Sequence, residues 1–221
     1  MVWRGGAKSS VFNKIAGSYI LPRGFRLLIH LRDINQAMAE AWKLAFADVA
    51  NVTVSCGSIV ESEADAIVSP ANSFGFMDGG IDLVYSRFFG WELESRLKKL
   101  IAEQYYGELP MGQAVIIPTE HEKIPFLISA PTMRVPSDIA GTINVYLAFR
   151  TVLIAVLEHN KMSKHKIKSI LVPGLGTGIG NVPPEQAAYQ MRQAYDAILG
   201  EQATKPRSAR EILVKHHQLL S

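Results

Sequence analysis

Apolar residues recur along this chain with two periods, one typical of strands and the other typical of amphipathic helices. Short runs of β-branched and large apolar residues, bounded by polar or glycine-containing segments, predict the strands. These strands are expected at residues 25–31, 52–56, 65–69, 113–117, 125–130 and 167–172. The segments between them carry apolar residues three and four positions apart, which predicts helices.

Residues that commonly begin or interrupt helices mark the helix boundaries. Asp33 and Thr142 are expected to act as N-caps, and Gly90 is expected to divide one helical segment in two. The resulting helices are expected at residues 34–45, 82–89, 92–104, 143–159, 183–199 and 209–220. For the last of these segments, a strand is the alternative interpretation.

Strands followed by helices through most of the chain are typical of an α/β domain. We predict a three-layer α/β/α fold in which helices cover both faces of a mixed, largely parallel central sheet. A chain of 221 residues, 48% of them hydrophobic, is long enough to bury one continuous core. The expected organisation is a basic N-terminal arm, residues 1–24, followed by a single domain, residues 25–221.

Charge is distributed unevenly along the chain, whose formal net charge is +3. Residues 1–32 contain six basic side chains and no acid, which leaves 17 basic against 20 acidic side chains in the remainder. Because the positive excess does not lie on the body of the domain, we expect no nucleic-acid partner. An organelle-targeting peptide is an alternative interpretation of the arm. The apolar stretches are too short to cross a membrane, so no membrane partner is expected.

Cysteine and histidine usage restricts both the chemistry and the compartment. Cys56 is the only cysteine, which excludes disulfides and Cys-x-x-Cys sites and indicates a reducing compartment, so we expect a cytoplasmic protein. The histidines lack the spacing of metal ligands, and we expect neither a metal site nor a cofactor.

Two loops follow predicted strands and carry residues suited to ligand binding, residues 69–82 and 173–180. In an open α/β sheet, ligands bind at the carboxyl ends of the strands. The second loop has four glycines in seven residues, so its backbone amides can surround an anion such as a diphosphate without obstruction by Cβ atoms. A tight connecting turn is the alternative. The loop has neither the lysine of a P-loop nor the third glycine of a GxGxxG dinucleotide site.

Several short segments resemble, in order and spacing, those of the macro domains, a family that binds ADP-ribose and processes ADP-ribose 1''-phosphate. The resemblance covers about residues 51–200 and implies a macro-domain-like fold. It rests on Gly57-Ser58-Ile59, on residues 65–72 (DAIVSPAN), on Gly79-Gly80-Ile81-Asp82, and on residues 109–114, 126–131 and 173–180. It implies that the ligand is bound by Ser58, Ile59, Asn72, Gly79, Gly80, Ile81, Gly174, Leu175, Gly176, Thr177, Gly178, Ile179 and Gly180.

The chain departs from the family pattern at positions that bear on function. Ser58 stands where the family usually has the aspartate that binds the adenine amino group, and Ser69 replaces the first asparagine of the common NAAN. Met77 and Asp78 replace two glycines, which adds bulk and a negative charge beside the ligand. Gly180 lacks the aromatic ring that often covers the distal ribose.

The resemblance identifies Asn72 and Asp82 as the candidate catalytic pair, because their ten-residue separation matches that of hydrolytic macro domains. A neutral carboxamide can orient the distal ribose, and a carboxylate can accept a proton from an attacking water. The alternative is structural: Asn72 would satisfy its own loop backbone, and Asp82 would cap the helix that it begins. Asp78 is a second candidate base.

The expected function is binding of ADP-ribose or an ADP-ribosylated substrate, with hydrolysis of an ADP-ribosyl or O-acyl-ADP-ribose linkage. A non-catalytic ADP-ribose reader is the main alternative. Binding of single-stranded nucleic acid in the same groove is a further alternative, since backbone amides do not by themselves distinguish a nucleotide from a strand. The oligomeric state is left open.

Overall fold

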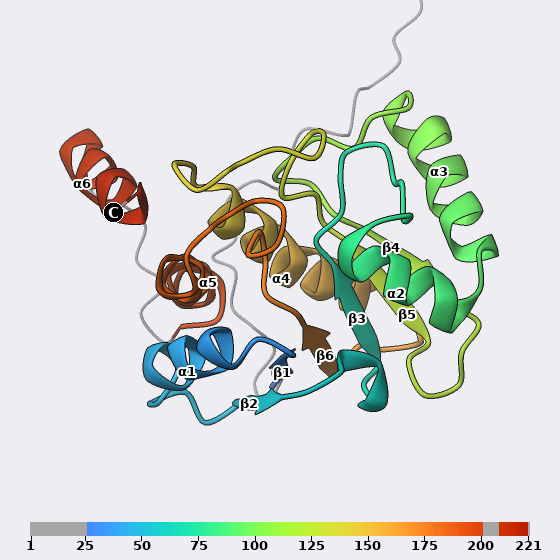
Figure 1. Ribbon diagram of the computed structural model, residues 1–221, viewed down its shortest axis with the longest axis horizontal. Coiled ribbons are helices and arrows are strands. Elements are labelled where there is room, and N and C mark those ends of the chain that lie inside the picture. The colour runs from blue at the N-terminus through green and yellow to red at the C-terminus, as the bar shows by residue number, and fades with distance from the viewer. Residues whose placement is uncertain (1–25, 201–207, 221) are drawn as a thin grey trace, which may run out of the picture.

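The computed structural model describes residues 26–200 and 208–220. The predicted arm at residues 1–24 therefore lies outside the described residues. Strands in the described part form one six-stranded sheet in the order β2-β1-β6-β3-β5-β4, in which only β4 runs antiparallel to its neighbour (Figure 1). The strands are β1 (Leu28–Asp33), β2 (Val52–Cys56), β3 (Ala66–Ser69), β4 (Val115–Pro118), β5 (Phe126–Ser129) and β6 (Ser169–Val172). The predicted mixed, largely parallel sheet is confirmed.

Helices cover both faces of this sheet, as predicted, and give three layers (Figure 1). Buried residues of α1, α4 and α5 form one hydrophobic cluster with the sheet, and those of α2 and α3 form another. The helices are α1 (Gln36–Ala45), η1 (Ile59–Glu61, a short 3₁₀ helix), α2 (Gly80–Phe89), α3 (Glu92–Tyr105), α4 (Asn144–Met162), α5 (Pro184–Ile198) and α6 (Ala209–Leu220).

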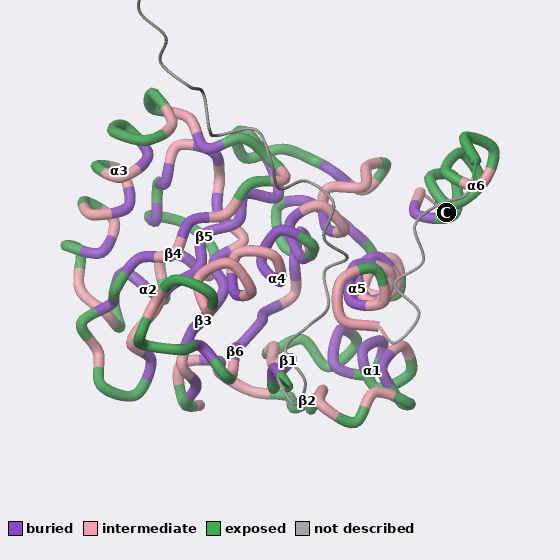
Figure 2. Tube along the Cα trace, turned by 180° about the vertical axis from the view of Figure 1, so that it is seen from behind, coloured by how far each residue is buried: buried purple, intermediate pink, exposed green. Residues whose placement is uncertain are grey.

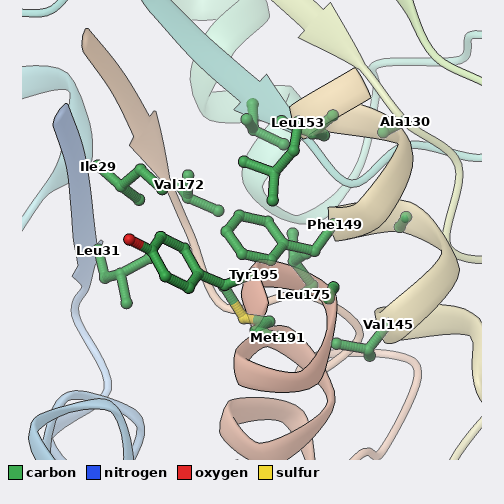
Figure 3. Close-up of a cluster of buried hydrophobic side chains, with 14 of the residues drawn as sticks. Ile29, Leu31, Ala130, Val145, Phe149, Leu153, Val172, Leu175, Met191 and Tyr195 are labelled. Atoms are coloured by element: carbon green, nitrogen blue, oxygen red, sulfur yellow. The ribbon is translucent and has the colours of Figure 1, made fainter. Parts of the chain in front are cut away.

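The central strands are buried on both sides because each strand sends alternate side chains into the two clusters. In β6, Ile170 and Val172 belong to the cluster under α4 and α5, whereas Leu171 belongs to the cluster under α2 and α3. Phe149 of α4 and Met191 of α5 pack against the first face (Figure 3). The tube coloured by burial shows the same arrangement, with buried strands between helices whose outer faces are exposed (Figure 2).

The prediction that Asp33 caps the first helix is wrong. β1 extends through Asp33 because that residue pairs with Cys56 of β2, and the N-cap of α1 is Asn35. The side-chain oxygen Oδ1 of Asn35 accepts hydrogen bonds from the backbone amides of Ala37 and Met38. A capping side chain must lie beside the first free amides of the helix. Because Asp33 still belongs to the sheet, the helix begins later, and the residue in the capping position is Asn35.

The predicted cap at Thr142 is displaced by one position. The N-cap residue of α4 is Ile143, which makes no side-chain capping bond, although the Thr142 hydroxyl accepts from the Asn144 amide at 3.3 Å. The division of the segment at Gly90 is confirmed, since α2 ends at Phe89. The tail segment is helical as predicted, and it forms α6. Within the described residues, no helix is long and apolar enough to cross a membrane.

Candidate functional site

A cavity of about 460 Å³ lies at the edge of the sheet where β1, β2, β3 and β6 end. Its lining residues come from five segments of the chain, within residues 32–35, 57–59, 70–84, 132–136 and 174–180. Parallel strands bring the loops at their carboxyl ends to one edge. The two loops singled out from the sequence therefore meet across a single cavity.

The loop after β6 presents a row of backbone amides without protein acceptors. From Leu175 to Gly180, no amide donates to another of the described residues, whereas the Gly174 amide donates to the Asp33 carboxylate at 2.8 Å. The loop closes on itself, because the amides of Asn181 and Val182 donate back to carbonyl oxygens within it. Such a closed loop holds its free N–H groups in place for an anion.

Glycine stands at these positions of the loop for different structural reasons. A Cβ atom on Gly180 would lie 2.5 Å from the Gly176 carbonyl oxygen, and Gly176 itself has a φ of +71° and close apolar neighbours. Glycine is therefore required at both positions by packing or backbone conformation. A Cβ atom on Gly178 would meet nothing within 4 Å, although Gly178 lines the cavity. The space in front of Gly178 is therefore part of the cavity.

The N-terminus of α2 supplies a second group of free amides to the same cavity. Gly79 is its N-cap and offers no side chain, so the amides of Gly80, Ile81 and Asp82 have no acceptor in the described part of the chain. Gly80 has a φ of +53°, which places the chain in the left-handed region just as the helix begins. Free amides and the helix dipole together favour an anion here.

Asn72 lines the cavity, but its side chain is bound within its own loop. Its carbonyl oxygen accepts from the amides of Phe74 and Phe76, at 3.0 and 3.3 Å, and its amide group donates to the Phe76 carbonyl oxygen at 2.8 Å. The side chain therefore shapes the loop between β3 and α2, which corresponds to the structural alternative for this residue.

Asp82 lies at the floor of the cavity and is only 8% exposed. Its carboxylate accepts a hydrogen bond of 2.6 Å from the hydroxyl of Ser69, at the end of β3. Burial raises the pKa of Asp82 to about 7, the Ser69 hydrogen bond opposes this rise, and the charge of Glu94 adds to it. Asp82 therefore serves no capping role in α2, and it titrates near neutral pH.

The end of the cavity beside β1 and β2 is occupied by Arg32 and Ser58. The Arg32 guanidinium donates to the Ser58 carbonyl oxygen at 2.8 Å and forms an ion pair with Glu61 at 3.4 Å. Gly57 lies under this guanidinium, since a Cβ atom there would be 2.6 Å from it. Ile59, which follows Ser58, is buried and also lines the cavity.

Of the residues that the sequence assigned to ligand binding or catalysis, all line the cavity except Leu175. The Leu175 side chain is fully buried in the core beside Phe149 (Figure 3). Met77, expected to add bulk beside the ligand, is also fully buried, because its side chain packs in the cluster under α2 and α3. Asp78 lines the cavity and is exposed.

Two parts of the cavity lining were not predicted from the sequence. Arg32 and Asp33 reach the cavity because β1 lies between β2 and β6, so that its end adjoins both loops. Thr132 and Met133 reach it because the chain after β5 returns alongside Asn72, with which Met133 forms a parallel bridge. For Arg32 and Asp33, the sequence did offer an indication, because two charged residues follow directly on an apolar strand.

Comparison with known proteins agrees with this arrangement. The family model described as "Macro domain" matches residues 68–191. An uncharacterized protein of Aquifex aeolicus (strain VF5) is 38% identical over 141 residues, which are 64% of this chain and 78% of that protein. The chain therefore belongs to the macro domain family.

Solved structures show the same fold. An Oceanobacillus iheyensis macrodomain with ADP has a TM-score of 0.55 at 22% identity, covering 74% of this chain and 86% of that chain. A mutant of the same macrodomain with ADPR has a TM-score of 0.54 at 21% identity, covering 73% and 88%. At these identities, the likeness concerns the fold.

Proposed function

We propose that this protein binds ADP-ribose, or a substrate that carries it, in the cavity at the carboxyl edge of the sheet. The observation that carries the proposal is the presence of two sets of backbone amides without protein acceptors, one at residues 176–180 and the other at residues 80–82, both of which line the same cavity. Two adjacent phosphates offer oxygen acceptors to both groups at once. Two of the structural neighbours were solved with ADPR and with ADP, which supports a nucleoside diphosphate as the ligand.

The position proposed for the diphosphate divides the cavity into two ends, one for each half of the ligand. The loop after β6 lies between the ends of β1 and β3, because β6 separates these strands in the sheet. One half of the ligand then extends toward Ser58 and Arg32, and the other half toward Asn72 and Asp82. We place the adenosine in the first position and the distal ribose in the second.

We further propose that the protein hydrolyses the bond between the distal ribose and a linked group. Asp82, with a pKa raised to about 7, is suited to accept a proton from an attacking water, because general bases work best when their pKa lies near the working pH. Water supplies the new oxygen, the bond to the linked group breaks, and the leaving group takes up a proton. Asn72 contributes by holding the loop that carries the ribose end of the site.

A non-catalytic reader is the second candidate, and two observations favour it. The polar atoms of the Asn72 side chain are bound within the loop, and Asp82 is nearly enclosed. Such a site could hold the ligand without activating water. For either candidate we propose a cytoplasmic location, because the free and exposed thiol of Cys56 suits a reducing compartment.

The test has two stages. Calorimetric titration with ADP-ribose, ADP, AMP and a short oligonucleotide should show the tightest binding to ADP-ribose, and absence of ADP-ribose binding would refute the proposal. Hydrolysis is then measured on ADP-ribosylated protein and on O-acetyl-ADP-ribose. Turnover should rise with pH through about 7 and level off once Asp82 is fully ionised, and Asp82→Ala should lower it by roughly 100-fold with a much smaller effect on binding. Tight binding without product release from either substrate would establish the reader.

A further inference from the structure

Asp78 is a carboxylate at the ribose end of the cavity that the proposed binding and hydrolysis do not use. It precedes Gly79, lines the cavity and is exposed. Among the described residues, it forms neither a hydrogen bond nor an ion pair. Its negative charge therefore faces whatever occupies this end of the cavity.

The charges of the other cavity residues do not offset Asp78. Arg32 is the only lysine or arginine among the described lining residues, and it lies at the opposite, β1 end, where it pairs with Glu61. Asp33 accepts from the amides of Asn35 and Gly174. The charge at the ribose end is therefore negative.

One candidate for a compensating cation is Lys98 of α3. Its ammonium group lies 3.6 Å from the centre of the Phe76 ring, and Phe76 lines the ribose end of the cavity. Lys98 is, however, paired with Glu94 on its own helix. Glu94 thus balances the positive charge of Lys98, and that charge does not offset the negative charge of Asp78.

Exposed apolar side chains line the same cavity as Asp78. Phe76 is 50% exposed and Val84 is 41% exposed, and both belong to the cavity lining. An apolar rim with an exposed carboxylate above the buried Asp82 fits a linked group that has an aliphatic body and a neutral or cationic head. In the proposed pose the diphosphate takes up the free amides of residues 80–82, so a further phosphate on the distal ribose would face the like charge of Asp78 without those donors, which is unfavourable.

We propose that Asp78 determines the class of group that this site accepts on the distal ribose, excluding a phosphate and favouring a neutral or guanidinium-bearing group. This inference rests on the proposed function, because it requires the ligand to place its distal ribose beside residues 72–82. At partly screened distances, one such charge changes affinity by about tenfold for a doubly charged phosphate.

The experiment compares three ligands by calorimetry: ADP-ribose, ADP-ribose with a phosphate on its terminal ribose, and ADP-ribose linked there to a guanidinium group. The wild type should bind ADP-ribose about tenfold more tightly than the phosphorylated ligand. Asp78→Asn should tighten binding of the phosphorylated ligand and weaken binding of the guanidinium ligand, with ADP-ribose itself changed less than about threefold. Opposite changes on two ligands are not produced by a general disturbance of the loop.

Glu103→Gln provides the matched control, because Glu103 is an exposed carboxylate of α3 outside the cavity lining. It should leave all three affinities unchanged. Equal affinities of wild type and Asp78→Asn for both charged ligands would overturn the assignment of Asp78 while leaving ADP-ribose binding intact. Failure of the wild type to bind ADP-ribose would instead refute the proposed function and this inference with it.

Discussion

The Asp82 carboxylate is buried at the floor of the cavity and accepts a hydrogen bond from the hydroxyl of Ser69. Its pKa is raised from 3.8 to about 7, mainly because burial disfavours the charged form. The hydroxyl of Ser69, which donates to it at 2.6 Å, supports the ionised state without preventing the rise. The ionised form of Asp82, which is the form that would accept a proton from water, therefore lowers the free energy of unfolding.

The pH dependence of stability follows from this shift. Between about pH 4 and pH 7, the folded protein holds a proton that the unfolded chain has released, so the free energy of unfolding falls as pH rises through this window. Asp82→Asn should remove this fall and raise the free energy of unfolding at pH 8 by up to about 4 kcal/mol, at about 1.4 kcal/mol for each tenfold change in proton affinity.

Urea unfolding at pH 5 and pH 8 measures this effect. Asp138→Asn is the control, because Asp138 is exposed and its pKa is lowered by hydrogen bonds from the Ala140 amide and Asn181. It should not stabilise the protein at pH 8. A gain for Asp82→Asn that is equal at both pH values would show that Asp82 is ionised throughout this range.

Gly178 allows the anion site to be tested without disturbing the fold. Because a Cβ atom there meets nothing within 4 Å, Gly178→Val should fold normally yet fill the space in front of the free amides. Affinity for ADP-ribose should fall at least about tenfold, since the phosphates can no longer approach the backbone.

Gly141→Val is the matched substitution, because Gly141 also has open space around its Cβ position but lies outside the cavity lining. It should bind ADP-ribose as the wild type does. Thermal unfolding of both variants establishes that they are folded. Wild-type affinity in Gly178→Val would show that the glycine loop only turns the chain.

At the scale of elements, one buried glutamine of α5 joins two other helices. The Gln190 amide group donates to the carbonyl oxygens of Thr142 before α4 and Leu219 in α6, at 2.8 and 2.7 Å. Its own oxygen accepts from the Tyr146 amide at 3.0 Å. Three hydrogen bonds thus satisfy this buried side chain.

Replacement of Gln190 by Met keeps most of its volume and removes all three hydrogen bonds. The free energy of unfolding should fall by about 2–3 kcal/mol, because buried backbone groups lose their partners. Hydrogen exchange should accelerate in α6, whose last carbonyl groups accept hydrogen bonds from this residue and from Gln186. Gln186→Met, which removes one bond of 3.2 Å, should cost less than about 1 kcal/mol. Unchanged exchange in α6 would contradict this role for Gln190.

At the scale of the whole molecule, the sheet order decides which segments can share a ligand. β1, β6 and β3 are adjacent, so residues separated by up to about 150 positions meet at one edge. The contacts offered to an anion there are backbone amides, with Arg32 as the only described lysine or arginine in the lining. Binding at this edge therefore depends on fixed dipoles more than on mobile cations.

This arrangement predicts a weak salt dependence of binding. Raising the salt concentration from 50 to 200 mM should weaken ADP-ribose binding by less than about tenfold, because few counterions are released when two phosphates bind. A strand of nucleic acid that contacts several lysines would lose about a thousandfold or more over the same range. Steep salt dependence, with efficient competition by a short oligonucleotide, would identify the cavity as a nucleic-acid groove.

Local sequence patterns were sufficient for the elements and for much of the site. Hydrophobic periodicity depends on near neighbours in the chain, and it predicted the strands, the helices and the break at Gly90. The glycines of residues 174–180 also indicated an anion loop, because glycine permits backbone approach wherever the loop lies in the fold.

Only the tertiary structure decided what individual side chains do. Leu175 lies within the glycine loop but points into the core, Asp33 binds the Gly174 amide in place of capping a helix, and Asp82 is enclosed beside Ser69. Each outcome depends on contacts between segments that the fold brings together. A hydrogen-bond partner, a buried face and a shifted pKa are properties of the surroundings, which no local pattern of residues specifies.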